Sequence, residues 1–269
     1  MTKIEKAVER AEELRRKNLG RTPPEPAHKA GAGGEPKPVY SETAVIPLDP
    51  DHLEKHRLMS LMDDPAAVDC YNLLRTQLLE RTRGKGHNAI MITSPGDGDG
   101  KTVTAIGLAA SIAREAKQSV LLVDTDLRHP NVHRYLGFSS KKGLSDYLRQ
   151  DATIPELLVN PGLDKMVVLP AGKPISGSTD MLGSPKMESL VKEMKGRYPE
   201  RYVIFDCPPL LTVSDALVFS SYVDGIILVV QAGATSKREI RKAMELLAGK
   251  NVVGLVMNAV KERTTSYYY

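Results

Sequence analysis

The chain has 269 residues, with 37 lysines and arginines against 33 aspartates and glutamates, so its formal net charge is +4. Hydrophobic residues make up 41% and charged residues 26%, values typical of globular proteins, which excludes a wholly disordered chain. So small a positive charge does not favour nucleic acid as a partner. Cys70 and Cys207 are too few for a disulfide framework, a zinc quartet or an iron–sulfur cluster.

No apolar run reaches the roughly 18–20 residues that span a bilayer. The charged N-terminus also has no apolar stretch of the kind that a signal peptide needs. We therefore expect a cytoplasmic protein that reaches the inner face of the membrane only through a partner.

The first fifty residues form two segments of different composition. Apolar residues at helical spacing and a capping box from Thr2 to Glu5 predict an amphipathic helix over residues 2–18, within an N-terminal segment 1–20. This helix either packs on its own domain or docks on another protein. Seven prolines and several glycines predict a linker over residues 21–50.

The main domain is expected over residues 51–262, followed by a flexible tail at 263–269. A helical region at 51–83, interrupted near Pro65, comes first, and short Val- and Ile-rich runs then alternate with helical patterns. Strands that are apolar on both faces and alternate with helices predict an α/β fold, a mostly parallel sheet with helices on both faces. Strands are expected at 89–94, 119–124, 165–170, 202–206, 224–231 and 251–258, and helices from Lys101, over 181–197 and over 237–247.

A glycine-rich segment, Thr-Ser-Pro-Gly-Asp-Gly-Asp-Gly-Lys-Thr at residues 93–102, lies between an expected strand and an expected helix. This is the context of a P-loop, in which backbone N–H groups and a helix N-terminus bind phosphate. Lys101 would reach the β- and γ-phosphates and the Thr102 hydroxyl would bind Mg²⁺. Pro95 stands where the strict pattern has glycine, so the match is imperfect. The expected nucleotide-binding residues are Gly96, Asp97, Gly98, Asp99, Gly100, Lys101, Thr102 and Val103.

Carboxylates end two of the expected strands. Asp124 and Asp126 follow one apolar run at a spacing of two, which places both side chains on one face of an extended segment. Asp206 ends another run. Ligands of open α/β sheets bind at the carboxyl ends of the strands, so these three side chains are expected to converge on one metal–phosphate site.

These motifs together resemble the bacterial tyrosine kinases of capsule and exopolysaccharide synthesis (BY-kinases). That family has a P-loop, an hhhDxDxR motif, an hhhDxPP motif and a C-terminal tyrosine cluster. Here they correspond to residues 98–102, 121–128, 203–209 and the tyrosines at 267–269. The resemblance covers about residues 65–269. The N-terminal helix and linker also resemble the start of tyrosine autokinases of exopolysaccharide and exosortase loci.

The resemblance implies a P-loop NTPase of the deviant Walker, MinD-like group, acting as a protein-tyrosine kinase with ATP and Mg²⁺. It implies autophosphorylation of Tyr267, Tyr268 and Tyr269 between subunits. It further implies a homo-oligomer, a membrane polysaccharide co-polymerase as activator, and a tyrosine phosphatase that reverses the reaction.

The residue roles follow from the matched motifs. Thr102, Asp126 and Asp206 would hold Mg²⁺, and Asp124 would accept the tyrosine proton, although Asp124 and Asp126 could exchange roles. Arg128 would orient the carboxylates or the acceptor, or else form a surface ion pair. Asn258 either contacts adenine or forms a turn.

Two positions depart from the family pattern. The family's ExxRxxR motif, linked to ring assembly, aligns with residues 69–75, where Asp69 and Asn72 replace the first two charged residues and only Arg75 is retained. Ring formation through those contacts is therefore in doubt. Gly107 stands where the family has Asn, and close packing is expected there because a glycine inside a helix costs about 1 kcal/mol relative to alanine.

Two other functions fit the same fold. A switch ATPase of the MinD/ParA type would carry a second lysine near the start of the P-loop, where this chain has Gly96. A nucleotide-binding adaptor would dock on a membrane co-polymerase without catalysis. The three consecutive tyrosines at 267–269 favour the kinase. Other aromatic residues are sparse, with three phenylalanines and no tryptophan, so a chance cluster of aromatic residues at the end of the chain is a minor alternative.

Overall fold

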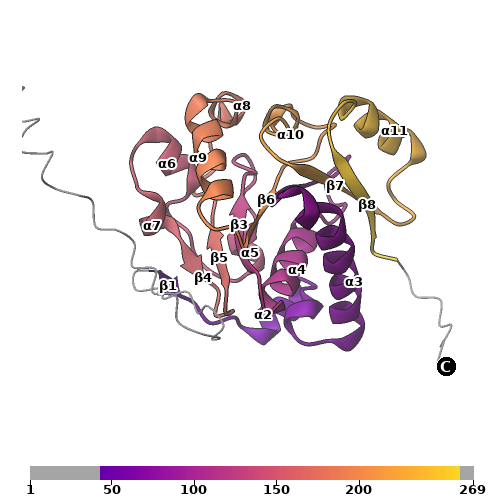
Figure 1. Ribbon diagram of the computed structural model, residues 1–269, viewed down its shortest axis with the longest axis horizontal. Coiled ribbons are helices and arrows are strands. Elements are labelled where there is room, and N and C mark those ends of the chain that lie inside the picture. Colours follow the sequence, from indigo (N-terminus) through magenta and orange to yellow (C-terminus); the bar gives the residue numbers. More distant parts are fainter. Residues whose placement is uncertain (1–42, 261–269) are drawn as a thin grey trace, which may run out of the picture. The chain divides into compact units, whose positions relative to one another are not determined.

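The computed structural model describes residues 43–260. The expected helix at 2–18, most of the expected linker and the three C-terminal tyrosines lie outside the described residues. Within the described part, a central sheet carries helices on both faces (Figure 1).

The sheet has the strand order β1-β4-β5-β3-β6-β2-β7-β8. Neighbouring strands run parallel except β4 and β5, which are antiparallel, so the predicted mostly parallel sheet is confirmed. The strands are β1 (Ala44–Val45), β2 (Ala89–Thr93), β3 (Ser119–Asp124), β4 (Val159–Asn160), β5 (Met166–Leu169), β6 (Arg201–Asp206), β7 (Gly225–Gln231) and β8 (Val252–Asn258).

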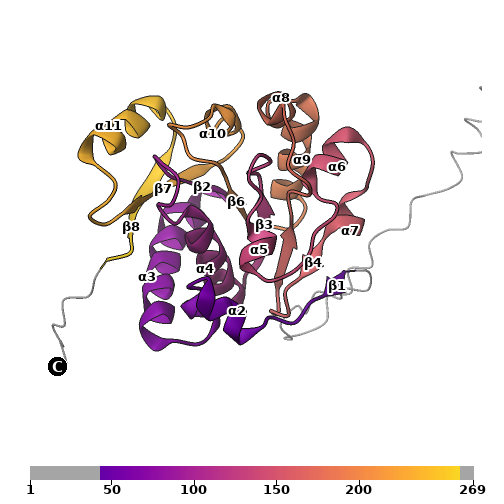
Figure 2. The same cartoon turned by 180° about the vertical axis from the view of Figure 1, so that it is seen from behind.

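Two cores lie on opposite faces of the sheet, because successive side chains of a strand point to opposite sides. In β2, Ala89 and Met91 join one core while Ile90 and Ile92 join the other. The first core is covered by α6 to α11 and the second by α2 to α5 (Figures 1 and 2). The helices are α2 (Pro50–Lys55), α3 (Pro65–Thr82), α4 (Lys101–Arg114), α5 (Val132–Tyr135), α6 (Leu144–Arg149), α7 (Ile154–Leu157), α8 (Ser178–Leu182), α9 (Pro185–Gly196), α10 (Asp215–Phe219) and α11 (Lys237–Leu246), with 3₁₀ turns η1 (Met59–Leu61) and η2 (Arg83–Lys85).

Helix caps mark where α3 and α9 begin, and the interruption expected near Pro65 is confirmed. Pro65 is the first residue of α3, and the Asp64 side chain accepts a hydrogen bond from Ala67 N at 2.8 Å. The helix expected over 181–197 is present as α9, but its expected start at residue 181 is wrong. Ser184 accepts a hydrogen bond from Met187 N at 3.2 Å, so α9 begins as a separate helix after α8 has ended.

The sequence did not predict the two-residue strands β1 and β4 or the short helices α5, α6, α7 and α10, because so few residues show little periodicity. One of them, β1, lies inside the segment 21–50 and pairs in parallel with β4. None of the helices within residues 43–260 combines the length and the apolar character needed to cross a membrane.

Candidate active site

The glycine-rich loop connects β2 to α4, as a P-loop does. Gly98 and Gly100 have φ angles of 83° and 94°, in the left-handed region that residues with a β-carbon rarely adopt. A β-carbon on Gly100 would lie 1.8 Å from the Asn258 side-chain nitrogen. Glycine is therefore required at position 100 both by the backbone conformation and by the close approach of the end of β8.

Hydrogen bonds of Asp99 stabilise the conformation of the loop. Its carboxylate accepts hydrogen bonds from Gly96 N at 2.9 Å and from the Thr235 hydroxyl at 2.5 Å. The Asn258 amide donates to the backbone carbonyl of Asp99 at 3.0 Å. The side chain of Asp99 thus bonds within the protein, and the ends of β7 and β8 hold the loop in shape. Sequence reasoning did not single out Thr235, which lies more than 130 residues from Asp99 in the chain.

Lys101 and Thr102 at the start of α4 reach the carboxylates of the neighbouring strands. Lys101 Nζ lies 3.2 Å from Asp126 Oδ2, and the Thr102 hydroxyl donates to Asp206 Oδ2 at 2.7 Å. Burial by itself would lower the pKa of Lys101, but the charges of Asp206, Asp126 and Asp124 outweigh it and raise that pKa. Lys101 is therefore a fully charged ammonium group in a buried setting.

The register of β3 and β6 brings the three aspartates together. Asp124 lies opposite Asp206, so the convergence expected from the sequence is observed. Asp206 Oδ1 is buried and has no hydrogen-bond partner within residues 43–260. Burial raises the pKa of Asp206, although Lys101 and Thr102 oppose the shift.

Asp124 is fully buried and holds the loop that follows β3. Its Oδ1 accepts from Asp126 N, and its Oδ2 accepts from Asn131 N and Val132 N, each at 3.1 Å. Burial and the charge of Asp206 raise the pKa of Asp124 well above its usual range. A carboxylate oxygen can accept two hydrogen bonds, and Oδ1 accepts one within residues 43–260.

Arg128 pairs with a carboxylate outside this group. Its Nε and Nη2 each lie 3.1 Å from an oxygen of Asp215, the buried first residue of α10. Ser178 and Thr179 of α8 donate to the same carboxylate. Asp215 was missed from the sequence, because an Asp in the first turn of a helix resembles an ordinary capping residue.

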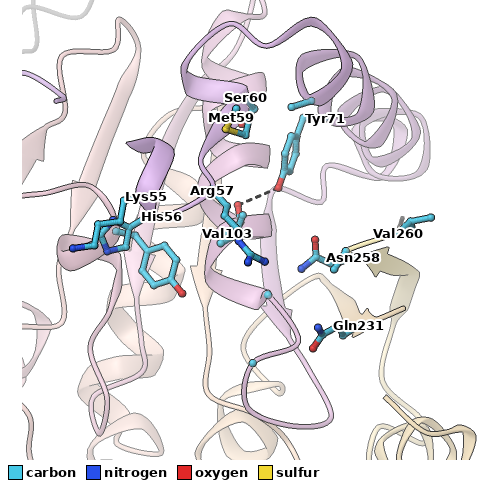
Figure 3. A pocket seen from close by; sticks show the side chains of 15 residues that line it. Lys55, His56, Arg57, Met59, Ser60, Tyr71, Val103, Gln231, Asn258 and Val260 are labelled. Carbon is cyan, nitrogen blue, oxygen red and sulfur yellow. Dashed lines mark hydrogen bonds between the residues drawn. The ribbon is translucent and has the colours of Figure 1, made fainter. Parts of the chain in front are cut away.

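A cavity of about 620 Å³ lies beside the P-loop (Figure 3). Gly98, Gly100 and Val103 form one side of it, and the side chains of Gln231 and Asn258 point into it from the ends of β7 and β8. The remaining lining residues are Lys55, His56, Arg57, Met59, Ser60, Ala67, Tyr71, Tyr135, Ala259 and Val260.

This arrangement fits a nucleotide. The loop supplies glycines in the required conformation, Lys101 supplies a buried positive charge, and Asp206 Oδ1 offers an unused acceptor. No group of three or more His, Cys, Asp or Glu side chains in residues 43–260 could hold a metal ion unaided. That finding is compatible with Mg²⁺ bound to nucleotide phosphates, because Mg²⁺ usually takes only one or two protein carboxylates.

Known proteins are similar to this chain in sequence and fold. The family described as an AAA domain matches residues 87–248. The chain is 32% identical over 211 residues to tyrosine-protein kinase YwqD of Bacillus subtilis, covering 77% of this chain and 88% of that one. It is also 32% identical over 225 residues to tyrosine-protein kinase etk of Escherichia coli, but covers only 31% of that longer chain.

Solved structures agree with the sequence matches. The kinase domain of Escherichia coli tyrosine kinase ETK superposes with a TM-score of 0.71 at 30% identity, covering 87% of this chain and 94% of that one. The septum site-determining protein MinD of Pyrococcus horikoshii, complexed with Mg-ADP, gives a TM-score of 0.53 at 25% identity, covering 63% of this chain and 69% of that one. With its nucleotide-binding loop and converging aspartates, the chain belongs to the bacterial tyrosine-protein kinase family, whose members transfer phosphate from ATP to protein tyrosine.

Proposed function

We propose that this kinase uses Mg²⁺ and ATP to phosphorylate Tyr267, Tyr268 and Tyr269 of a neighbouring copy. The observation that carries the proposal is the meeting of Lys101 and Thr102 with three buried aspartates at the carboxyl ends of β3 and β6. Phosphoryl transfer needs positioned positive charge and metal ligands more than covalent chemistry, and this site supplies both.

The loop amides and Lys101 would hold the phosphates, and Thr102, Asp126 and Asp206 would hold the metal. When bound, ATP supplies the transferred phosphoryl group and Mg²⁺ neutralises its charge. Lys101 would then exchange its contact with Asp126 for phosphate oxygens, which frees Asp126 Oδ2 as an acceptor. The Asn258 amide, which faces the cavity, would lie beside the nucleotide base.

Asp124 is the proposed base for the acceptor tyrosine. A phenol with a pKa near 10 needs a proton acceptor, and a carboxyl with a raised pKa is a better acceptor than an ordinary one. The capacity of Asp124 Oδ1 for a second hydrogen bond supports this role. Arg128 is proposed as a positioning residue, because its bonds to Asp215 tie the loop after β3 to α10.

We further propose a place for the kinase in the cell. It would lie in the cytoplasm, on the inner face of the membrane, where a membrane co-polymerase activates it during capsule or exopolysaccharide synthesis. A tyrosine phosphatase would remove the phosphate groups from the C-terminal tyrosines. In support, the P-loop, the two aspartate motifs and the C-terminal tyrosines resemble the motifs of kinases of capsule and exopolysaccharide synthesis.

Replacing the P-loop lysine tests the proposal. Lys101→Met should lower tail phosphorylation at least about 100-fold, because a buried charge that stabilises the transition state is removed. The purified chain is incubated with Mg-ATP, alone and with the cytoplasmic segment of a candidate co-polymerase, and phosphate is mapped by mass spectrometry. Lys192→Met is the matched control, because Lys192 is exposed on α9 and pairs with Glu188 of the same helix.

The alternatives give different results in this assay. ATP hydrolysis with unmodified tyrosines would indicate a switch ATPase. Nucleotide binding without hydrolysis or phosphorylation, with and without the partner segment, would indicate an adaptor.

A further inference from the structure

The C-terminal end of α2 has an arginine where glycine is favoured. Leu58 N donates to Leu53 O and Arg57 N donates to Glu54 O, both at 2.9 Å, which is the Schellman arrangement. Its left-handed position is occupied by Arg57, with a φ angle of 58°. Residues with a β-carbon adopt this conformation at a cost, and such outliers gather at functional sites. The side chain of Arg57 is therefore a candidate for a functional role.

The segment that carries Arg57 is fixed on the helix of the P-loop. Leu53 and Leu58, on either side of the turn, are 3% and 1% exposed and belong to the core that α4 also lines. Arg114 of α4 donates to the carbonyl of Ser60 at 2.9 Å. The position of Arg57 relative to the phosphate-binding loop is thus set by packing.

Basic side chains line the cavity beside the loop. Lys55, His56 and Arg57 line it, and no aspartate or glutamate is among its lining residues within 43–260. The guanidinium of Arg57 points into the cavity that Val103 and Asn258 also line (Figure 3). Within the described part of the chain, no carboxylate pairs with Arg57.

We propose that Arg57 binds a phosphate group of the nucleotide held at the P-loop, as a specificity residue supplied by the segment before the nucleotide-binding domain. A planar guanidinium with several N–H donors matches phosphate oxygens in charge and shape. The protein tolerates the strained backbone at Arg57 because the Arg57 side chain contributes to phosphate binding. This inference rests on the proposed binding of ATP and adds a residue that the family motifs do not contain.

Arg57→Gly separates the effect of Arg57 on backbone strain from its effect on nucleotide affinity. In the absence of nucleotide the variant should melt at the same or a higher temperature, because glycine relieves the backbone strain. Its dissociation constant for ATP should rise about 10-fold to 100-fold, the value of a lost hydrogen bond to a charged group. Arg57→Lys, which keeps the charge, should recover part of the affinity.

A second left-handed residue provides the matched control. Gln150 ends α6 with a φ angle of 74° and does not line the cavity. Gln150→Gly should relieve backbone strain in the same way and leave the ATP dissociation constant unchanged. Binding is measured by calorimetry and melting by differential scanning fluorimetry, so neither readout depends on kinase activity.

Comparison of ATP, ADP and adenosine tests the phosphate assignment. Loss of affinity in Arg57→Gly for ATP and ADP but not for adenosine supports it, whereas an equal loss for adenosine overturns it. Equal ATP affinity of Arg57→Gly and the wild type overturns the inference alone. If the wild type binds no ATP, the proposed function falls as well.

Discussion

The packing of one neighbouring side chain explains why residue 107 of α4 is a glycine. A β-carbon at this position would lie 2.3 Å from Cζ of Tyr71 on α3, and the Tyr71 hydroxyl donates to the carbonyl of Val103 at 3.2 Å. The close packing expected at Gly107 is therefore confirmed. The aromatic ring seated against the glycine joins α3 to the helix that follows the P-loop, and this contact offsets the poor helix propensity of glycine.

Gly107→Ala should destabilise the protein even though alanine is the better helix former. The added methyl group forces Tyr71 to move, and such overpacking typically costs about 1–3 kcal/mol. The measurement is the free energy of unfolding in urea. Gly196 at the end of α9 is the control, since a β-carbon there has open space and Gly196→Ala should be neutral or stabilising by up to about 1 kcal/mol. Equal effects of the two substitutions would contradict this account of Gly107.

At the scale of elements, Asp215 joins three parts of the structure. As the first residue of α10 it accepts hydrogen bonds from Arg128, after β3, and from Ser178 and Thr179 of α8. Burial by itself would raise the pKa of Asp215, but these hydrogen bonds and the charge of Arg128 outweigh it and lower the pKa. The side chain of Arg128 is 35% exposed, and solvent screening reduces what this ion pair contributes.

The lowered pKa of Asp215 predicts a pH-dependent stability. Its contribution is complete above the unfolded pKa of aspartate, about 3.9, and is lost as pH falls through the lower folded value. Asp215→Asn should cost about 1–3 kcal/mol at pH 7, and the difference from the wild type should shrink below about pH 4. Urea unfolding across pH 3–7 measures both. A difference that stays constant over this range would show that the charge of Asp215 does not stabilise the fold.

At the scale of the whole molecule, the sheet places the last described residues beside the nucleotide site. Asn258 ends β8 and bonds to the P-loop, and Val260, where the described part ends, lines the cavity. The tyrosines at 267–269 therefore follow within nine residues of the site. Short sequence distance makes transfer within one chain a real competitor to the proposed transfer between copies.

Mixing two defective chains decides between these routes. One chain carries Lys101→Met with an intact tail, and the other is active but has all three tail tyrosines changed to phenylalanine. Transfer between copies predicts phosphate on the tail of the Lys101→Met chain, detected by mass spectrometry. Transfer within one chain predicts no phosphate in the mixture while the wild type alone labels itself.

Most of the fold could be predicted from local patterns. Buried strands such as β3 and β7 are rich in Val, Leu and Ile, and α4 begins at the lysine of the glycine-rich loop. The predicted helix boundary was wrong where a single capping residue starts a new helix. Ser184 caps α9 and so separates it from α8. It also omitted β1 and β4, which are two residues long and exist only because they pair with other strands.

For the candidate site, the sequence by itself determined the parts that are local: the glycines, Lys101, Thr102 and the aspartates that end β3 and β6. These could be predicted because a strand followed by a turn or a carboxylate is a pattern of adjacent residues. Only the tertiary structure decided that Asp215 pairs with Arg128, that Thr235 braces Asp99 and that Arg57 faces the cavity. Arg128 and Asp215 are 87 positions apart, and Asp99 and Thr235 are 136 apart, so the packing of helices on a shared sheet, rather than any local propensity, brings them together.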